Sequence, residues 1–137
     1  MNATHLIGSE MFYEDMGNGS FLITLKVYRE CGPANTQGTG FDDIIYLGLI
    51  NTSNNQLLNV YDVFLNFATV QNVPIIMTNP CGTPPPDLCV EEATYTATIS
   101  LGASAQGYEI AWQRCCRNPT ISNVQNSSGT DNPGMTA

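Results

Sequence analysis

Apolar and polar residues alternate along several short stretches of the chain, which is the pattern of a β-strand with one buried face. In Phe21–Val27 every second residue is Phe, Ile, Leu or Val, and Leu57–Phe67, Ala93–Leu101 and Tyr108–Trp112 alternate in the same way. Ile44–Ile50 is apolar throughout, which predicts a strand buried on both faces. No segment shows a convincing helical period. The pattern predicts a protein built from strands.

Turn-forming residues separate these strands. Gly17–Gly19, with the sequence Gly-Asn-Gly, lies between the short strand Met11–Tyr13 and Phe21–Val27, which predicts a tight β-hairpin. Val73–Met77 predicts a further short strand, and Pro74 places it at a sheet edge because proline lacks an N–H. We therefore expect an all-β fold, an antiparallel β-sandwich of about seven to eight strands, either immunoglobulin-like or jelly-roll-like.

The chain of 137 residues predicts a single sandwich domain over residues 1–137. Its polar tail, residues 121–137, predicts a linker or the start of a further strand. Met1–His5 has neither the basic nor the apolar region of a signal peptide, so we expect an exported protein without its leader. No stretch approaches the roughly 20 apolar residues that span a bilayer, which argues against membrane insertion.

The charge balance narrows the class of partners. Four basic and twelve acidic residues give a net charge of −8, and only 12% of the residues are charged. Binding to nucleic acid depends on clustered Lys and Arg side chains, which this chain lacks. We expect no nucleic-acid partner and no attraction to an anionic membrane surface.

The five cysteines indicate an oxidising compartment, because disulfide-stapled β-structure is typical of exported proteins. Cys81 and Cys89 bracket a proline-rich loop, and we expect a disulfide between them. The alternation of strand faces places Cys31 and Cys116 toward the core and predicts a second disulfide between these two. Cys115 takes the place of Cys116 if a bulge shifts the strand, and one thiol is left over. Zinc is a poor alternative, since no paired C-x-x-C motif exists.

The order of several blocks resembles the amino-terminal domain of large secreted surface proteins of Bacteroidota, many of which carry a gliding-motility or type IX secretion sorting domain. The matching blocks are Thr4–Glu10, Gly17–Gly19, Leu25–Cys31, Cys89–Tyr95 and Gln113–Asn118. They cover most of the chain in order, and the last two are specific.

The resemblance implies an exported, non-enzymatic module at the cell surface or outside the cell, whose partners are other protein domains or cell-surface glycans. Relatives carry a cysteine where this chain has Asp15, which would explain the odd cysteine count. We therefore expect a structural or adhesive module. One alternative is a subunit that self-associates through strand edges into an extracellular filament, and another is a carbohydrate-binding module.

Residues suited to catalysis are few. His5 is the only histidine and lies at the terminus, which argues against a Ser or Cys nucleophile with a histidine base. We expect no enzyme and no cofactor. A calcium site is the alternative if Asp87, Glu91 and Glu92 converge, although Glu91 and Glu92 are expected to hold backbone amides or pair with Arg114 or Arg117. Trp112 is expected in the core, and a sugar-binding platform is its alternative role.

Overall fold

The computed structural model describes residues 6–32, 40–76, 82–83, 87–114 and 135–136. Within these ranges every regular element is a β-strand except one turn of 3-10 helix. The elements are β1 (Leu6–Gly17), β2 (Ser20–Glu30), β3 (Ile44–Asn51), β4 (Gln56–Phe64), η1 (Phe67–Thr69), β5 (Gln71–Asn72), β6 (Val90–Ser100), β7 (Tyr108–Arg114) and β8 (Met135–Thr136). Among the described residues, no helix is long and apolar enough to cross a bilayer.

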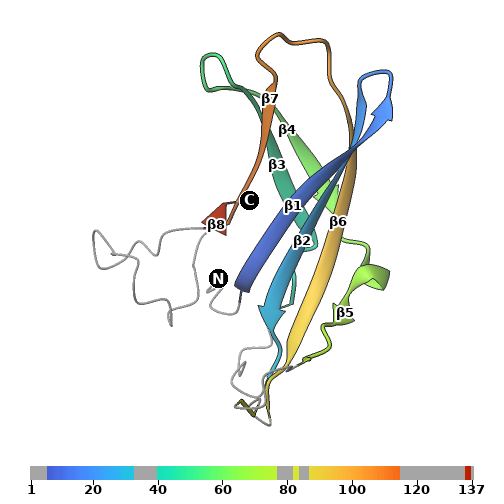
Figure 1. Ribbon diagram of the computed structural model, residues 1–137, viewed down its shortest axis with the longest axis vertical. Helices are drawn as coiled ribbons and strands as arrows, with labels where there is room; N and C mark the ends of the chain where they lie inside the picture. Colours follow the sequence, from blue (N-terminus) through green and yellow to red (C-terminus); the bar gives the residue numbers. More distant parts are fainter. Residues whose placement is uncertain (1–5, 33–39, 77–81, 84–86, 115–134, 137) are drawn as a thin grey trace, which may run out of the picture.

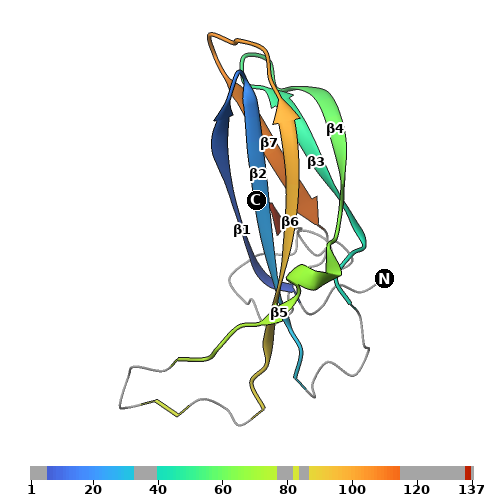
Figure 2. The same cartoon turned by 90° about the vertical axis from the view of Figure 1, so that its right-hand side faces the viewer.

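The strands form two antiparallel sheets that face each other (Figure 1). The first sheet has the order β1-β2-β6-β5, and the second has the order β4-β3-β7-β8. Turned by 90°, Figure 2 shows β1, β2 and β6 alongside one another, with β3, β4 and β7 in the layer behind them. The structure confirms the predicted disulfide-stapled β-sandwich.

The predicted hairpin joins β1 to β2 through Asn18 and Gly19, which have φ angles of 55° and 74°. Positive φ at both central residues is what a two-residue type I′ turn requires, and Asn-Gly is the preferred sequence for it. β2 then pairs with β1 on one side and with β6 on the other, from Ser20↔Ser100 to Glu30↔Val90. The hairpin is longer than predicted, because β1 begins at Leu6.

The core lies between the sheets and is built from the alternating residues that the sequence singled out. Its buried hydrophobic residues are Ile23, Leu25, Val27, Ile45, Leu47, Val63, Leu65, Ala93, Tyr95, Ile99 and Trp112. Burying a side chain of this size stabilises the fold by roughly 1.5–3 kcal/mol relative to leaving it exposed. The Tyr95 hydroxyl is also satisfied, since it donates a hydrogen bond of 2.7 Å to the backbone carbonyl oxygen of Asp42.

Two details of the strand prediction are wrong. β3 is buried on one face only, since Ile45, Leu47 and Leu49 are buried while Tyr46 is 59% exposed. The predicted edge strand Val73–Met77 is not a strand over its described residues, 73–76, and the edge strand β5 lies just before it. Pro74 cannot donate a ladder hydrogen bond, which accounts for the end of pairing at this point.

A disulfide joins Cys31 to Cys89, with a Cα–Cα distance of 4.9 Å. β2 ends and β6 begins at the paired residues Glu30 and Val90, so the next residues outward also face each other. The Cys31 amide donates a 2.9 Å hydrogen bond to the Cys89 carbonyl oxygen there. Both cysteines were predicted to be crosslinked, but the predicted partners were wrong, because Cys31 and Cys89 bond to each other. The remaining cysteines, Cys81, Cys115 and Cys116, lie outside the described residues.

Candidate functional site

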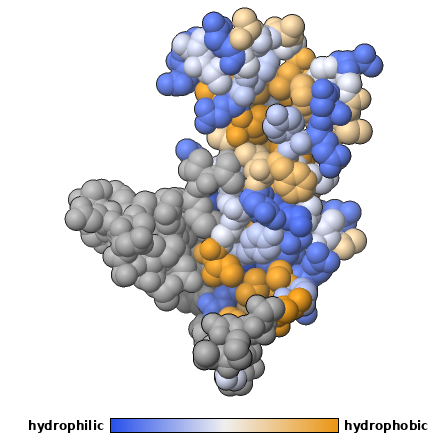
Figure 3. Space-filling view, in the orientation of Figure 1, coloured by the Kyte–Doolittle hydropathy of each residue, from blue (hydrophilic) through white to orange (hydrophobic). Residues whose placement is uncertain are grey.

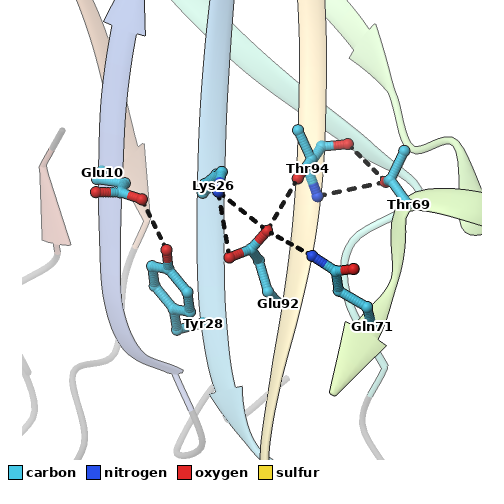
Figure 4. Close-up of polar contacts among 7 residues, drawn as sticks. All are labelled: Glu10, Lys26, Tyr28, Thr69, Gln71, Glu92 and Thr94. Atoms are coloured by element: carbon cyan, nitrogen blue, oxygen red, sulfur yellow. Dashed lines mark hydrogen bonds and ion pairs between the residues drawn. The ribbon is translucent and has the colours of Figure 1, made fainter. Parts of the chain in front are cut away.

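The outer face of the first sheet carries a network of polar side chains (Figure 4). At its centre the carboxylate of Glu92, on β6, is 3.3 Å from the Lys26 ammonium on β2. The same carboxylate accepts hydrogen bonds from Gln71 on β5 and from Thr94. Glu92 is only 7% exposed, so its charge depends on these partners. The network holds three neighbouring strands in register.

The partners also set the ionisation of Glu92. Burial, the largest single influence, would raise the pKa of this carboxyl. Hydrogen bonds from Lys26, Tyr28 and Gln71, together with the Lys26 charge, outweigh burial and hold the Glu92 pKa below its ordinary value. Tyr28 also donates to Glu10 at 2.7 Å, and this hydrogen bond raises the pKa of the Tyr28 hydroxyl. A carboxylate held ionised by such partners stabilises the sheet and is a poor general acid.

The acidic residues of the alternative calcium site are not brought together. Glu91 forms an ion pair with Arg29, whose guanidinium also lies 4.8 Å from the centre of the Phe41 ring. Within the described ranges no group of three or more His, Cys, Asp or Glu side chains is placed to hold a metal ion. The structure therefore does not bring Asp87 together with Glu91 and Glu92 as a calcium site.

Of the partners expected for Glu91 and Glu92, Arg114 is excluded because it pairs with another acid. Arg114, on β7, instead forms an ion pair with Asp42 at 2.9 Å. The backbone oxygen of Asp42 accepts the Tyr95 hydroxyl, so this contact ties both sheets to the residues before β3. Burial raises the pKa of Tyr95, the Asp42 charge adds to this rise, and the Arg114 charge opposes it. His5 and Arg117 lie outside the described residues.

An apolar cleft opens between the sheets at the end opposite the disulfide, and it is the second candidate site. It has a cavity volume of about 940 Å³. We call it the β1–β7 cleft. Its lining includes Met11, Tyr13, Phe21, Ile23, Leu101–Ser104, Gly107, Tyr108, Glu109 and Ile110. Figure 3 shows apolar surface in this part of the molecule, between two more hydrophilic rims.

The cleft exists because the described strands of the second sheet do not cover part of the inner face of β1. Tyr13 pairs with Ile23 and therefore lies on the inner face of the first sheet. Ile23 is 3% exposed, as an inner residue should be, whereas Tyr13 is 69% exposed. The Tyr13 and Phe21 rings meet in an edge-to-face arrangement, with 6.0 Å between their centres. An inward-facing aromatic residue is thus left open to whatever enters the cleft.

The far wall of the cleft is β7, one edge of which is largely unpaired among the described residues. β7 pairs with β3 through Tyr108–Trp112 on one side. On its other side β8 pairs only with Gln113 and Arg114, and no described residue pairs with Tyr108–Trp112 there. An unpaired edge offers a row of backbone N–H and C=O groups to a further strand. Hydrogen-bonding backbone and an apolar cavity therefore meet at one place.

Trp112 lies in the core as expected, since it is 3% exposed, and this excludes its alternative role as a sugar-binding platform. Sequence reasoning missed the cleft that lies near it. The lining residues Phe21, Ile23, Tyr108 and Ile110 read as ordinary core positions of alternating strands, and nothing in that alternation shows that the sandwich leaves them partly uncovered.

Comparison with known proteins adds no relative. No protein-family model matches the chain, and no characterised protein or solved structure matches it either. The function has to be argued from the cleft itself.

Proposed function

We propose that this chain is a non-enzymatic, extracellular structural and adhesive module of a bacterial cell-surface protein, which binds an extended segment of another protein in the β1–β7 cleft. The observation that carries the proposal is the edge of β7 at Tyr108–Trp112, with which no described residue pairs, beside an apolar cavity. An incoming strand would satisfy the backbone of β7 and cover the inner face of β1.

The location outside the cytoplasm is supported by the Cys31–Cys89 disulfide, since such bonds form and persist in oxidising compartments. The blocks that resemble the amino-terminal domain of secreted Bacteroidota surface proteins support the same location. Two of these blocks, Leu25–Cys31 and Cys89–Tyr95, contain the disulfide and the Lys26–Glu92 ion pair. They therefore build the scaffold of the first sheet, and the cleft lies at its other end.

The dimensions of the site define the ligand. The free stretch of β7 spans five residues, which is about 17 Å of extended chain. Side chains of such a strand alternate, so every second residue would enter the cavity between Tyr13 and Ile110 while the others face solvent. Main-chain hydrogen bonds provide affinity that is independent of sequence, and the cavity selects for apolar side chains. We expect a short, alternating apolar segment.

Hydrogen exchange tests this function directly. We would add the alternating peptide Thr-Val-Thr-Val-Thr-Val to the full chain and follow the β7 amides by NMR. Binding should slow exchange at the amides of Tyr108–Trp112 that point away from β3. Tyr13→Asp, which places a charge in the cavity, should abolish this protection, and Phe64→Asp, a matched change at an exposed β4 residue, should not. Unchanged exchange in the wild-type protein would contradict the proposal.

Carbohydrate binding is a second candidate because four aromatic residues, Phe12, Tyr13, Phe21 and Tyr108, line the cleft. The two rings nearest each other do not form a flat platform, since Tyr13 and Phe21 meet at 72°. Glycan-array binding that is lost in Tyr13→Ala would favour this function over strand binding.

A further inference from the structure

The chain also contains an apolar, strand-forming segment that would suit the cleft. Segment and cleft lie at opposite ends of the molecule. Residues Val73–Ile76 follow β5 without forming a strand. Ile75 is 43% exposed and Ile76 is 78% exposed, although both are β-branched residues that favour strands. Val73 donates a 2.8 Å hydrogen bond to the Val90 carbonyl oxygen at the start of β6. Beyond it, Pro74–Ile76 is an apolar segment that belongs to no described strand.

The segment cannot reach the cleft of its own chain. β5 pairs with Glu91 and Glu92 at the beginning of β6, whereas the cleft is lined by Leu101, just past the end of β6. The eleven residues of β6 lie between them, which corresponds to about 34 Å. Figure 1 shows β5 at the lower end of the first sheet and the β1–β2 hairpin at the upper end. Contact between segment and cleft therefore requires two molecules.

Charge also favours this segment as the occupant. The chain carries a net charge of −8, so most of its surface repels a second copy. No Asp, Glu, Lys or Arg occurs between Asp62 and Asp87, the part of the sequence that contains Val73–Ile76. Glu109 is the only charged residue among those that line the cleft. An uncharged apolar segment can enter this cavity without leaving an unpaired charge buried.

We propose that Pro74–Ile76 of one copy, which follows the Val73–Val90 hydrogen bond, inserts into the β1–β7 cleft of a second copy as a strand on the edge of β7 that no described residue pairs with. This inference rests on the proposed strand-binding function and names its partner. Because donor and acceptor lie at opposite ends, each bound copy leaves one cleft and one segment open. The association is head to tail and continues into an open chain of copies. Pro74 fits a strand that pairs along one edge only.

The test uses two variants of the full chain that disable opposite ends. Ile76→Asp removes the donor and keeps the cleft, whereas Tyr13→Asp blocks the cleft and keeps the donor. Both residues are largely exposed, so neither change disturbs the core. Phe64→Asp, at an equally exposed position on β4, is the matched control. Sedimentation velocity over a wide range of concentration reports the size of the species.

We expect the wild-type protein and Phe64→Asp to form species that grow with concentration. Ile76→Asp alone and Tyr13→Asp alone should each associate at least about ten-fold more weakly than wild type, because a carboxylate would enter an apolar cavity. An equimolar mixture should form dimers and no larger species, since one intact cleft meets one intact segment. Formation of these dimers also shows that both variants are folded.

Two results would overturn the assignment. One is a wild-type protein that stays monomeric at all concentrations. The other is a mixture of the two variants that stays monomeric while wild type associates, which would place the contact elsewhere. If the Thr-Val peptide protects β7 in the same protein, only the choice of partner fails and the strand-binding function stands. If the peptide also leaves β7 unprotected, both fail.

Discussion

Cys31 and Cys89 are bonded to each other just beyond Glu30 and Val90, at the end of the ladder where β2 ends and β6 begins. The bond closes a loop with a sequence separation of 58 residues. By the chain-entropy estimate, closing a loop of this length stabilises the folded state by about 4 kcal/mol. The disulfide is therefore a large part of the stability of a domain of this size.

The first prediction concerns this bond. The double variant Cys31→Ser/Cys89→Ser should lose about 4 kcal/mol of unfolding free energy, measured by urea denaturation. A non-reducing digest of the wild-type protein, analysed by mass spectrometry, should contain a linked peptide pair with Cys31 and Cys89. A digest that links Cys81 to Cys89 instead would contradict the observed pairing.

The second prediction concerns the tip of the β1–β2 hairpin. Gly19 has a φ of +74°, and a Cβ atom there would lie 2.6 Å from the carbonyl oxygen of Leu101. Gly17 has a φ of +85° but has no atom within 4 Å of such a Cβ, and Gly40 has neither constraint. Thermal unfolding should show that Gly17→Ala costs about 1–2 kcal/mol from backbone strain. Gly19→Ala should cost more, and Gly40→Ala should change little.

The close approach at Gly19 also helps to shape the β1–β7 cleft. The Gly19 carbonyl oxygen accepts a 2.8 Å hydrogen bond from the Leu101 amide, so this contact fixes one rim of the β1–β7 cleft. If Gly19→Ala destabilised the fold no more than Gly17→Ala, this would contradict the close contact between Gly19 and Leu101.

The third prediction concerns pH. The pKa of Glu92 lies below its ordinary value of 4.5 in the folded protein, so the folded state binds this proton more weakly than the unfolded chain does. The network therefore stabilises the fold fully above about pH 4.5, and its contribution is lost as the pH falls through the lower folded value.

Urea denaturation at a series of pH values checks this. The difference in unfolding free energy between wild type and Glu92→Gln should be largest near neutral pH and should shrink in acid. Glu14→Gln, at an exposed β1 position, serves as the matched control for the loss of one carboxylate. A difference that grows as the pH falls would mean that the folded pKa of Glu92 is raised.

The fourth prediction separates two tyrosine hydroxyls. Tyr95→Phe keeps the buried ring and removes the hydrogen bond to the Asp42 carbonyl, so it should cost about 1 kcal/mol of unfolding free energy. Tyr28→Phe removes an exposed hydrogen bond to Glu10 and should cost less. In an ultraviolet titration, Tyr28 and Tyr95 should ionise at a higher pH than a free tyrosine, because both pKa values are raised. Equal losses of stability would contradict the buried position of the Tyr95 hydroxyl.

Much of the fold could be predicted because it is encoded locally. Asn18-Gly19 specifies a hairpin turn by its backbone preferences alone, and the alternation from Ala93 to Leu101 places Tyr95 and Ile99 in the core as expected. The apolar run of β3 was less informative, because Tyr46 is apolar enough to fit either face of a sheet.

The features that were missed depend on which distant strands become neighbours. The Cys31–Cys89 bond follows at once from the pairing Glu30↔Val90, but nothing local to either strand specifies that pairing. Tyr13 is the same case, since its position in a strand could be predicted and its exposure could not. Exposure at Tyr13 is set by how far β7 and its neighbours extend across the other sheet. Long-range arrangement thus decided both the crosslink and the cleft.

The disulfide also determines how the module would respond to force. A pull applied to the two ends of the chain would pass from Cys31 directly to Cys89 through the sulfur atoms, so β3, β4 and β5 would carry no load. The bypassed loop stores about 200 Å of extended chain, estimated from 58 residues at about 3.4 Å each. Tension on the chain would leave that length folded until a reductant broke the disulfide.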